Sequence, residues 1–105
     1  MTHLSTDTCL NLVMPRGLEE AVSDLLLAHP ELRASFTACR VEAHGDGVEL
    51  RSASEHVRGH ADRMRMELLL SRQDADRMLD YLRQNLPNPA IFYWTTPILT
   101  AGKLA

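Results

Sequence analysis

Lysine is nearly absent from this 105-residue chain: Lys103 is the only one, beside ten arginines and fourteen acidic residues. The net charge is −3, and no stretch of the sequence gathers the arginines together. Nucleic-acid-binding domains normally carry an excess of basic charge, so we expect no nucleic-acid partner. No apolar run approaches the about 20 residues that cross a membrane, so we also expect no membrane insertion.

Targeting signals and cysteines are scarce as well. The N-terminus has no basic segment followed by a hydrophobic one, which predicts the absence of a secretory signal peptide and a cytoplasmic location. The two cysteines, Cys9 and Cys39, lie in apolar, strand-like segments. We interpret them as small buried hydrophobic residues, with a disulfide or redox pair as the alternative.

Hydrophobic periodicity predicts a single domain over residues 1–105. Strand-like patterns cover residues 8–14, 36–43, 62–70 and 90–96. One helical pattern follows Gly17 and ends before Pro30, and a second begins at a Ser71 cap and ends before Pro87. The order β-α-β-β-α-β predicts an α+β ferredoxin-like sandwich, in which a four-stranded antiparallel sheet carries both helices on one face.

Alternation along the strands assigns side chains to the two faces of this sheet. The face expected under the helices holds Leu10, Leu12, Cys39, Val41, Met64, Met66, Leu68, Phe92 and Trp94. The opposite face would hold Asn11, Val13, Arg40, Glu42, Arg65, Glu67, Leu69, Ile91 and Tyr93. Because this second face mixes charges with apolar groups, we expect a homo-oligomer to cover it.

No catalytic constellation stands out in this framework. Ser-His-Asp, Cys-His and paired-carboxylate arrangements are not evident, so we predict a protein without enzymatic activity. A soft-metal chaperone of this fold would carry Cys-x-x-Cys near the end of the first strand, where this chain has MPRG. That turn, Pro15-Arg16-Gly17, would either hold an anion with Arg16 and free backbone N–H groups or form a plain helix start.

The stretch 44–60, HGDGVELRSASEHVRGH, is the most informative segment. It separates two strands that would otherwise form a hairpin, and ordinary hairpin loops have only about 2–5 residues. Long surface loops on a rigid scaffold commonly carry function, so we look for the site here. Its three histidines, His44, His56 and His60, with Glu55 as an oxygen donor, are candidate ligands for Zn²⁺, Ni²⁺, Co²⁺ or Cu²⁺. His56 and His60 would share one face of a helical turn, and His44 would approach His60 at the hairpin neck. Solvated loop residues are the alternative.

The whole chain resembles the PII-like signalling superfamily, and more closely its uncharacterised branch encoded beside heavy-metal efflux systems. Three segments carry the resemblance: CLNLVMP running into Gly17-Leu18-Glu19-Glu20, then Glu55-His56-Val57-Arg58-Gly59, and finally Tyr93-Trp94 with Pro97 and Gly102-Lys103-Leu104. The resemblance implies a trimer whose sheets face inward around a three-fold axis.

The resemblance also implies roles for individual segments. Residues 44–60 would be the mobile T-loop that docks a partner, often a membrane transporter and here a metal-efflux pump. Ligand and partner contacts would come from Gly45, Gly47, Arg51, Glu55, Arg58 and Gly59. Gly102 and Lys103 would reach a neighbouring subunit's cleft, where PII-like proteins bind adenine nucleotides.

The chain departs from the nitrogen-regulatory PII proteins in two places. Between the second helix and the last strand those proteins have a Gly-rich, Lys-containing phosphate loop, whereas this chain has NLPNPA. The long loop also lacks a tyrosine of the kind that is modified in some PII proteins. Two functions therefore compete: a regulator that responds to a nucleotide, anion or metal, and a metal-binding or metal-buffering protein that uses His44, His56 and His60.

Overall fold

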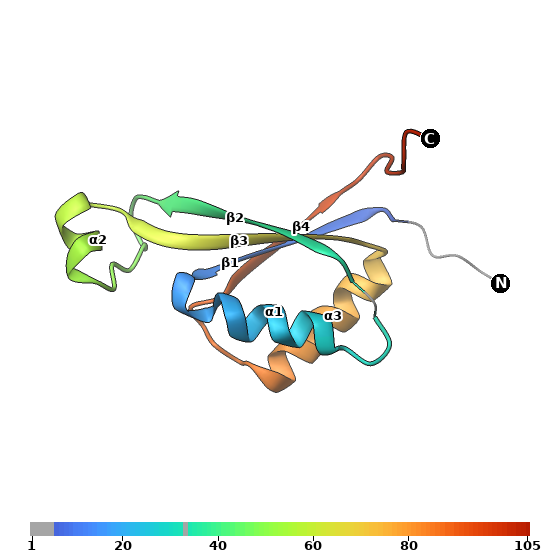
Figure 1. The fold of residues 1–105 in the computed structure, drawn as a ribbon, viewed down its shortest axis with the longest axis horizontal. Coiled ribbons are helices and arrows are strands. Elements are labelled where there is room, and N and C mark those ends of the chain that lie inside the picture. Colours follow the sequence, from blue (N-terminus) through green and yellow to red (C-terminus); the bar gives the residue numbers. More distant parts are fainter. Residues whose placement is uncertain (1–5, 33) are drawn as a thin grey trace.

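The computed structural model describes residues 6–32 and 34–105, and over these residues it confirms the predicted α+β architecture. Four antiparallel strands form one sheet in the order β2-β3-β1-β4, and helices α1 and α3 cover one of its faces (Figure 1). The elements are β1 (Thr8–Pro15), η1 (Arg16–Leu18), α1 (Glu19–Ala28), β2 (Phe36–Ala43), α2 (Ala53–Arg58), β3 (Ala61–Leu70), α3 (Arg72–Asn85) and β4 (Phe92–Pro97). None of the described helices has the length and apolar character needed to cross a membrane.

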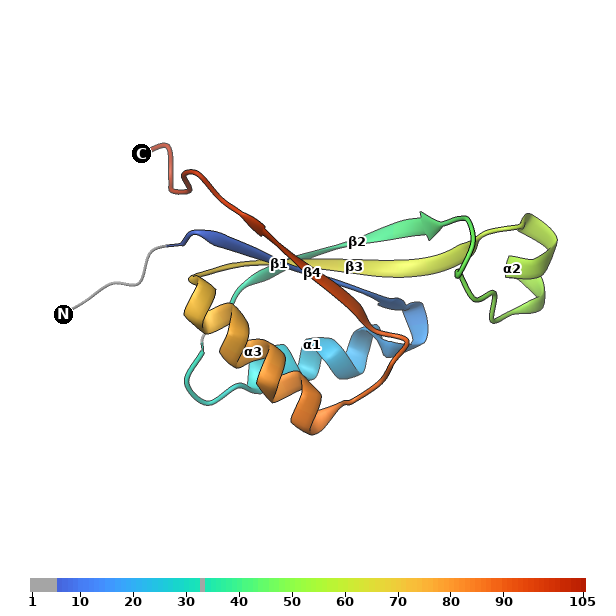
Figure 2. The same ribbon diagram turned by 180° about the vertical axis from the view of Figure 1, so that it is seen from behind.

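The core lies between the sheet and the two helices (Figure 2). Both central strands, β1 and β3, turn alternate apolar side chains toward α1 and α3, so that these side chains are removed from water. Helix α3 begins where the sequence predicts, because Ser71 Oγ accepts a hydrogen bond from the backbone N–H of Asp74 at 3.1 Å. The buried core side chains of the sheet are Leu10, Leu12, Met14, Met64, Met66, Leu68 and Leu70.

The face assignment predicted for the two edge strands is wrong. In β4, Tyr93 pairs with Leu12 and therefore lies on the helix side, whereas Phe92 and Trp94 lie on the uncovered face. The sequence does alternate there, but alternation leaves open which set of side chains faces the core. The pairing with a neighbouring strand decides that choice.

Strand β2 shows the same reversal. Its residue Ala38 pairs with Met66, so Arg40 and Glu42 lie on the helix side of the sheet, and Cys39 and Val41 lie on the uncovered side. Cys39 is consequently exposed, and the prediction that both cysteines are buried holds only for Cys9. Polar residues are tolerated on the helix side here because β2 is an edge strand whose end runs past the helices (Figure 1).

We predict that two adjacent leucines of α1 contribute very differently to stability. Leu26 is 0% exposed and Leu27 is 69% exposed. The substitution Leu26→Ala leaves a cavity in the core and should lower the free energy of unfolding by about 2–5 kcal/mol, whereas Leu27→Ala should change it by less than about 0.5 kcal/mol. Urea denaturation of both variants checks this. Equal losses would contradict the helix orientation described here.

Candidate functional site

Strands β2 and β3 continue beyond the helices as a projecting hairpin, and residues 44–60 form its tip (Figure 1). The tip contains a short helix, α2, which the sequence analysis did not predict. Ser52 caps this helix by accepting a hydrogen bond from Glu55 N–H at 3.1 Å. Gly59 ends it in the left-handed conformation, with φ 77°. The loop is thus a folded unit with its own start and stop signals.

The Glu55 carboxylate holds this unit together from inside. It is buried, and its two oxygens accept hydrogen bonds from backbone N–H groups on both sides of α2: Arg51 at 2.7 Å and Asp62 at 2.8 Å. These bonds hold the pKa of Glu55 below its ordinary value, and the bond from Arg51 has the largest effect. The nearby Arg63 guanidinium also lowers this pKa, whereas burial raises it. Both oxygens therefore accept backbone N–H groups of the loop, and Glu55 lies outside the group of potential metal ligands that the described residues bring together, Glu42, His44 and His60.

Two arginines complete the internal bonding of the loop. Arg63, in β3, lies 3.8 Å from the Glu55 carboxylate. It also donates a hydrogen bond to the backbone carbonyl of Glu49 at 2.6 Å. Arg58 pairs with Asp62 at 2.5 Å and donates to the carbonyl of Ser54. Arg58 therefore stabilises the loop's own structure, in addition to any contact that it makes with a ligand.

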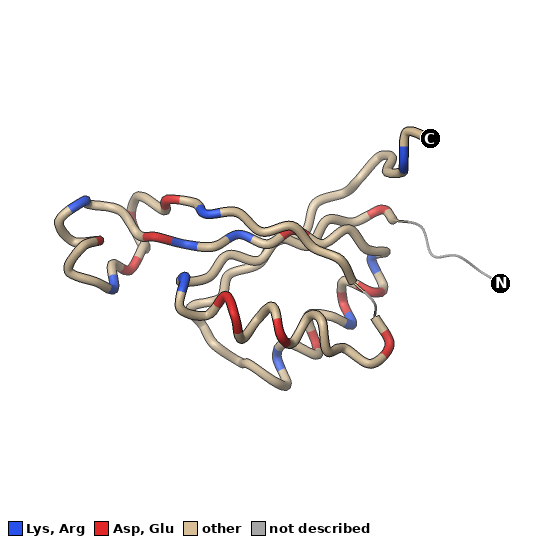
Figure 3. The backbone as a smooth tube through the Cα atoms, viewed as in Figure 1, with Lys and Arg blue, Asp and Glu red and all other residues tan. Residues whose placement is uncertain are grey.

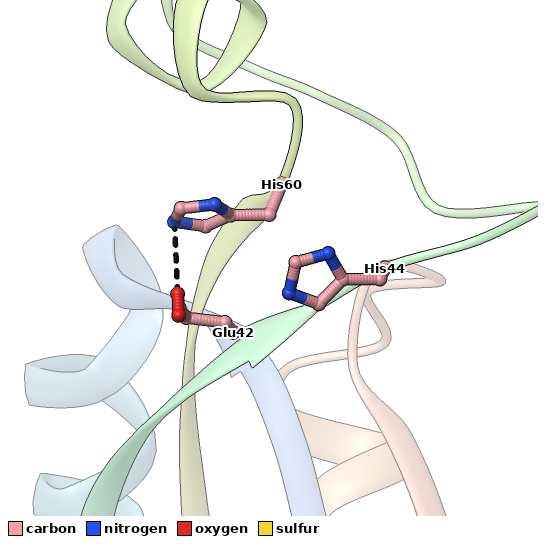
Figure 4. Close-up of side chains that lie close together, drawn as sticks. All are labelled: Glu42, His44 and His60. Carbon is pink, nitrogen blue, oxygen red and sulfur yellow. Dashed lines mark ion pairs between the residues drawn. The ribbon is translucent and has the colours of Figure 1, made fainter.

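At the neck of the hairpin the structure brings together two of the three loop histidines. The rings of His44 and His60 lie 5.2 Å apart, as predicted, and His60 Nε2 lies 3.3 Å from Glu42 Oε2 (Figure 4). His56 lies on α2, outside this cluster, because α2 ends at Arg58 and does not carry through to His60. The sequence analysis did not include Glu42 among the candidate ligands, because it looked for donors only within residues 44–60. The pattern Glu-x-His at a strand end was the signal that would have found it.

A polar cleft of ≈ 700 Å³ lies at the foot of the loop. The predicted anion-binding turn lines one side of it with Arg16 and Gly17, and the loop lines the other with Arg51 and Glu55. Residues far apart in the sequence therefore meet here. Gly102 and Lys103 do not reach this cleft within one chain, because the C-terminal segment leaves β4 at the end of the molecule opposite the loop (Figures 1 and 2).

Charged residues of both signs occur along the hairpin and on the helices, whereas strands β1 and β4 carry none (Figure 3). Basic and acidic side chains alternate along the hairpin, and several of them pair with one another, among them Arg65 with Glu67 and Arg58 with Asp62.

Comparisons with known proteins agree on the fold. Residues 4–105 match the family described as "Protein of unknown function (DUF3240)", and no curated protein matches. Among solved structures, a DUF3240 family protein from Shewanella baltica OS155 superposes with a TM-score of 0.73 at 18% identity, over 97% of this chain and 100% of that one.

Two PII-like proteins also share the fold. A putative PII-like signaling protein from Thermus thermophilus has a TM-score of 0.58 at 20% identity, over 88% of this chain and 86% of its own. CPII, a nitrogen regulatory PII-like protein from Thiomonas intermedia K12 solved with ADP, AMP and bicarbonate, has a TM-score of 0.64 at 10% identity, over 93% of this chain and 96% of its own.

We predict that Glu55→Gln loosens the loop without unfolding the sheet. Oε1 and Oε2 of Glu55 each accept one of the two N–H groups, and a carboxamide replaces one of these oxygens with an NH₂ group that cannot accept, so either Arg51 or Asp62 loses its partner. Amide hydrogen exchange at one or both of these residues, measured by NMR, should accelerate by about tenfold or more. Glu49→Gln is the matched control, because the Glu49 side chain is exposed and contacts only Arg51 in this region. Unchanged exchange in Glu55→Gln would show that the carboxylate does not hold the loop.

Proposed function

The chain belongs to the DUF3240 family of proteins of unknown function, and we propose that it is a non-enzymatic regulatory protein of the PII-like type. It would work in the cytoplasm as a homotrimer and use the loop 44–60 to dock a partner. The observation that carries this proposal is the loop itself: a self-contained folded unit, bonded through Glu55, at the tip of a hairpin that projects from the body of the molecule.

The uncovered sheet face supports the homotrimer. Phe92, 65% exposed, and Trp94 lie there side by side with ring centroids 6.0 Å apart, and Leu69 is exposed on the same face. An apolar surface of this kind is costly in water and marks an interaction site. Three sheets facing a common axis would bury it, as the resemblance to PII-like proteins implies.

The tip of the hairpin offers a surface for a partner. Val57 on α2 is 87% exposed and is flanked by His56 and Arg58, so an apolar contact lies within a polar rim. We propose a membrane transporter as this partner, with a metal-efflux pump as the specific candidate. The support is the resemblance to PII-like proteins together with the loop's projection away from the proposed trimer face.

The cleft at the foot of the loop is the proposed ligand site. Arg16 and Arg51 line it, beside the acidic Glu19, Glu55 and Asp62. Lys103 of a neighbouring subunit would approach it in the trimer. An adenine nucleotide is the proposed ligand, since the Thiomonas protein is bound to ADP and AMP. A ligand that contacts Arg51 would act on the loop directly, because the Arg51 N–H is one of the two groups held by Glu55. It would shift the loop only by binding its two states with different affinity.

We predict that Phe92→Glu dissociates the homotrimer. A carboxylate cannot be buried between apolar sheets without a partner, so light scattering should give the mass of one 11.8 kDa chain instead of three. Leu27→Glu is the control, because Leu27 is similarly exposed but lies on a helix on the other side of the sheet. A monomeric wild-type protein would contradict the proposed assembly.

We also predict that Arg16→Ala weakens the binding of ADP by at least about tenfold, since a charge-assisted phosphate contact contributes about 1.5–3 kcal/mol. Isothermal titration calorimetry measures this, with Arg77→Ala on α3 as the control, because Arg77 pairs with Glu31 and Asp74 away from the cleft. Equal affinities of the two variants would place the nucleotide elsewhere.

A further inference from the structure

The Glu42, His44 and His60 cluster follows directly from the register of β2 and β3. The last pairs of the ladder join Glu42 with Asp62 and Ala43 with Ala61. One further step places His44 opposite His60, and Glu42, two residues earlier, lies on the same face as His44. The rigid sheet therefore presents three potential metal ligands together at the neck of the loop (Figure 4).

The spacing of these three side chains suits one metal ion. One potential ligand atom from each residue lies within 4.8 Å of the others. In a tetrahedral zinc site, bonds of about 2.0–2.1 Å place neighbouring ligand atoms about 3.3–3.4 Å apart. The distance of 3.3 Å from His60 Nε2 to Glu42 Oε2 already matches one such edge. His44 is exposed, and a small rotation of its side chain would bring the other two ligand-atom distances, now within 4.8 Å, to the same length.

The surroundings also favour a cation. The His60 side chain is only 13% exposed, which holds its ring in place, and Asp62 Oδ1 lies 3.7 Å from its Nε2 and adds negative charge. The Asp62 carboxylate is itself oriented by Arg58. Two imidazoles with one carboxylate are the donor set that Zn²⁺ and its borderline neighbours prefer, and an exposed fourth position is left for water.

We propose that Glu42, His44 and His60 form a three-ligand site for a borderline divalent cation, of which Zn²⁺ is the representative ion. This set differs from the three loop histidines, since Glu42 takes the place of His56. Because one ligand pair joins the end of β2 to the start of β3, the ion would close the neck and restrict the loop beyond it. The effect on the docking loop rests on the proposed function, whereas the metal site itself does not.

Titration with Co²⁺ tests the site, since a tetrahedral Co²⁺ complex absorbs visible light. The wild-type protein should bind one Co²⁺ per chain, and excess Zn²⁺ should displace it. His60→Ala and His44→Ala should each weaken binding by at least about tenfold. His56→Ala is the matched control, because His56 is an exposed loop histidine outside the cluster, and it should bind as the wild type does.

The alternatives have distinct outcomes. Binding that survives in His44→Ala and His60→Ala, or is lost equally in His56→Ala, overturns the assignment of ligands. No binding in the wild type overturns the site as a whole, while the nucleotide-dependent regulator would still stand. Circular dichroism of each variant verifies that lost binding does not reflect lost folding.

Limited trypsin digestion tests the effect on the loop. Arg51 and Arg58 are the cleavage sites within residues 44–60. Zn²⁺ should slow cleavage there in the wild type but not in His60→Ala, which controls for any action of the ion on the protease. Metal binding without slower cleavage would overturn the link to the loop and would leave the metal site in place.

Discussion

The projecting loop depends on one buried carboxylate. Glu55 accepts a backbone N–H from Arg51, ahead of α2, and another from Asp62, in β3, so it joins the two ends of the loop through its own side chain. Ordering a loop of this length costs conformational entropy, and these hydrogen bonds offset part of that cost. Arg63 lies against the same carboxylate and anchors the preceding segment through the carbonyl of Glu49. A ligand at the foot of the loop and a metal at its neck would both act on this one bonded unit.

The sheet register has the same importance for the rest of the surface. The β2–β3 pairing brings Glu42, His44 and His60 to one place, and the β1–β4 pairing turns Phe92 and Trp94 outward. A shift of one residue in either ladder would move each of these side chains to the opposite face. The proposed metal site and the proposed trimer face are thus consequences of the backbone pairing as well as of the residues themselves.

These features divide the molecule into regions with different tasks. The side of the sheet under α1 and α3 provides stability, and the other side carries exposed aromatic groups beside paired charges such as Arg65 and Glu67. The hairpin places the loop beyond the helices (Figure 1), and the histidine cluster lies at the neck of the hairpin (Figure 4). Such separation permits a loop to change its state without loss of the core, which is what the proposed docking role requires.

The sequence by itself determined the order of the four strands and of helices α1 and α3, the capping of α3 by Ser71 and the place of the long loop. Each of these features depends on local spacing or on the positions of Pro and Gly, or it belongs to a central strand, whose apolar residues can only face the core. It also indicated that His44 and His60 would meet, because both flank one hairpin. Only the tertiary structure decided which residues of β2 and β4 face the helices, that Glu42 and not His56 joins the histidines, and that Glu55 is a structural anchor. An edge strand can turn either set of its side chains toward the helices. A short helix ends where its cap and its contacts with β3 set its end. These outcomes therefore depend on residues far away in the sequence.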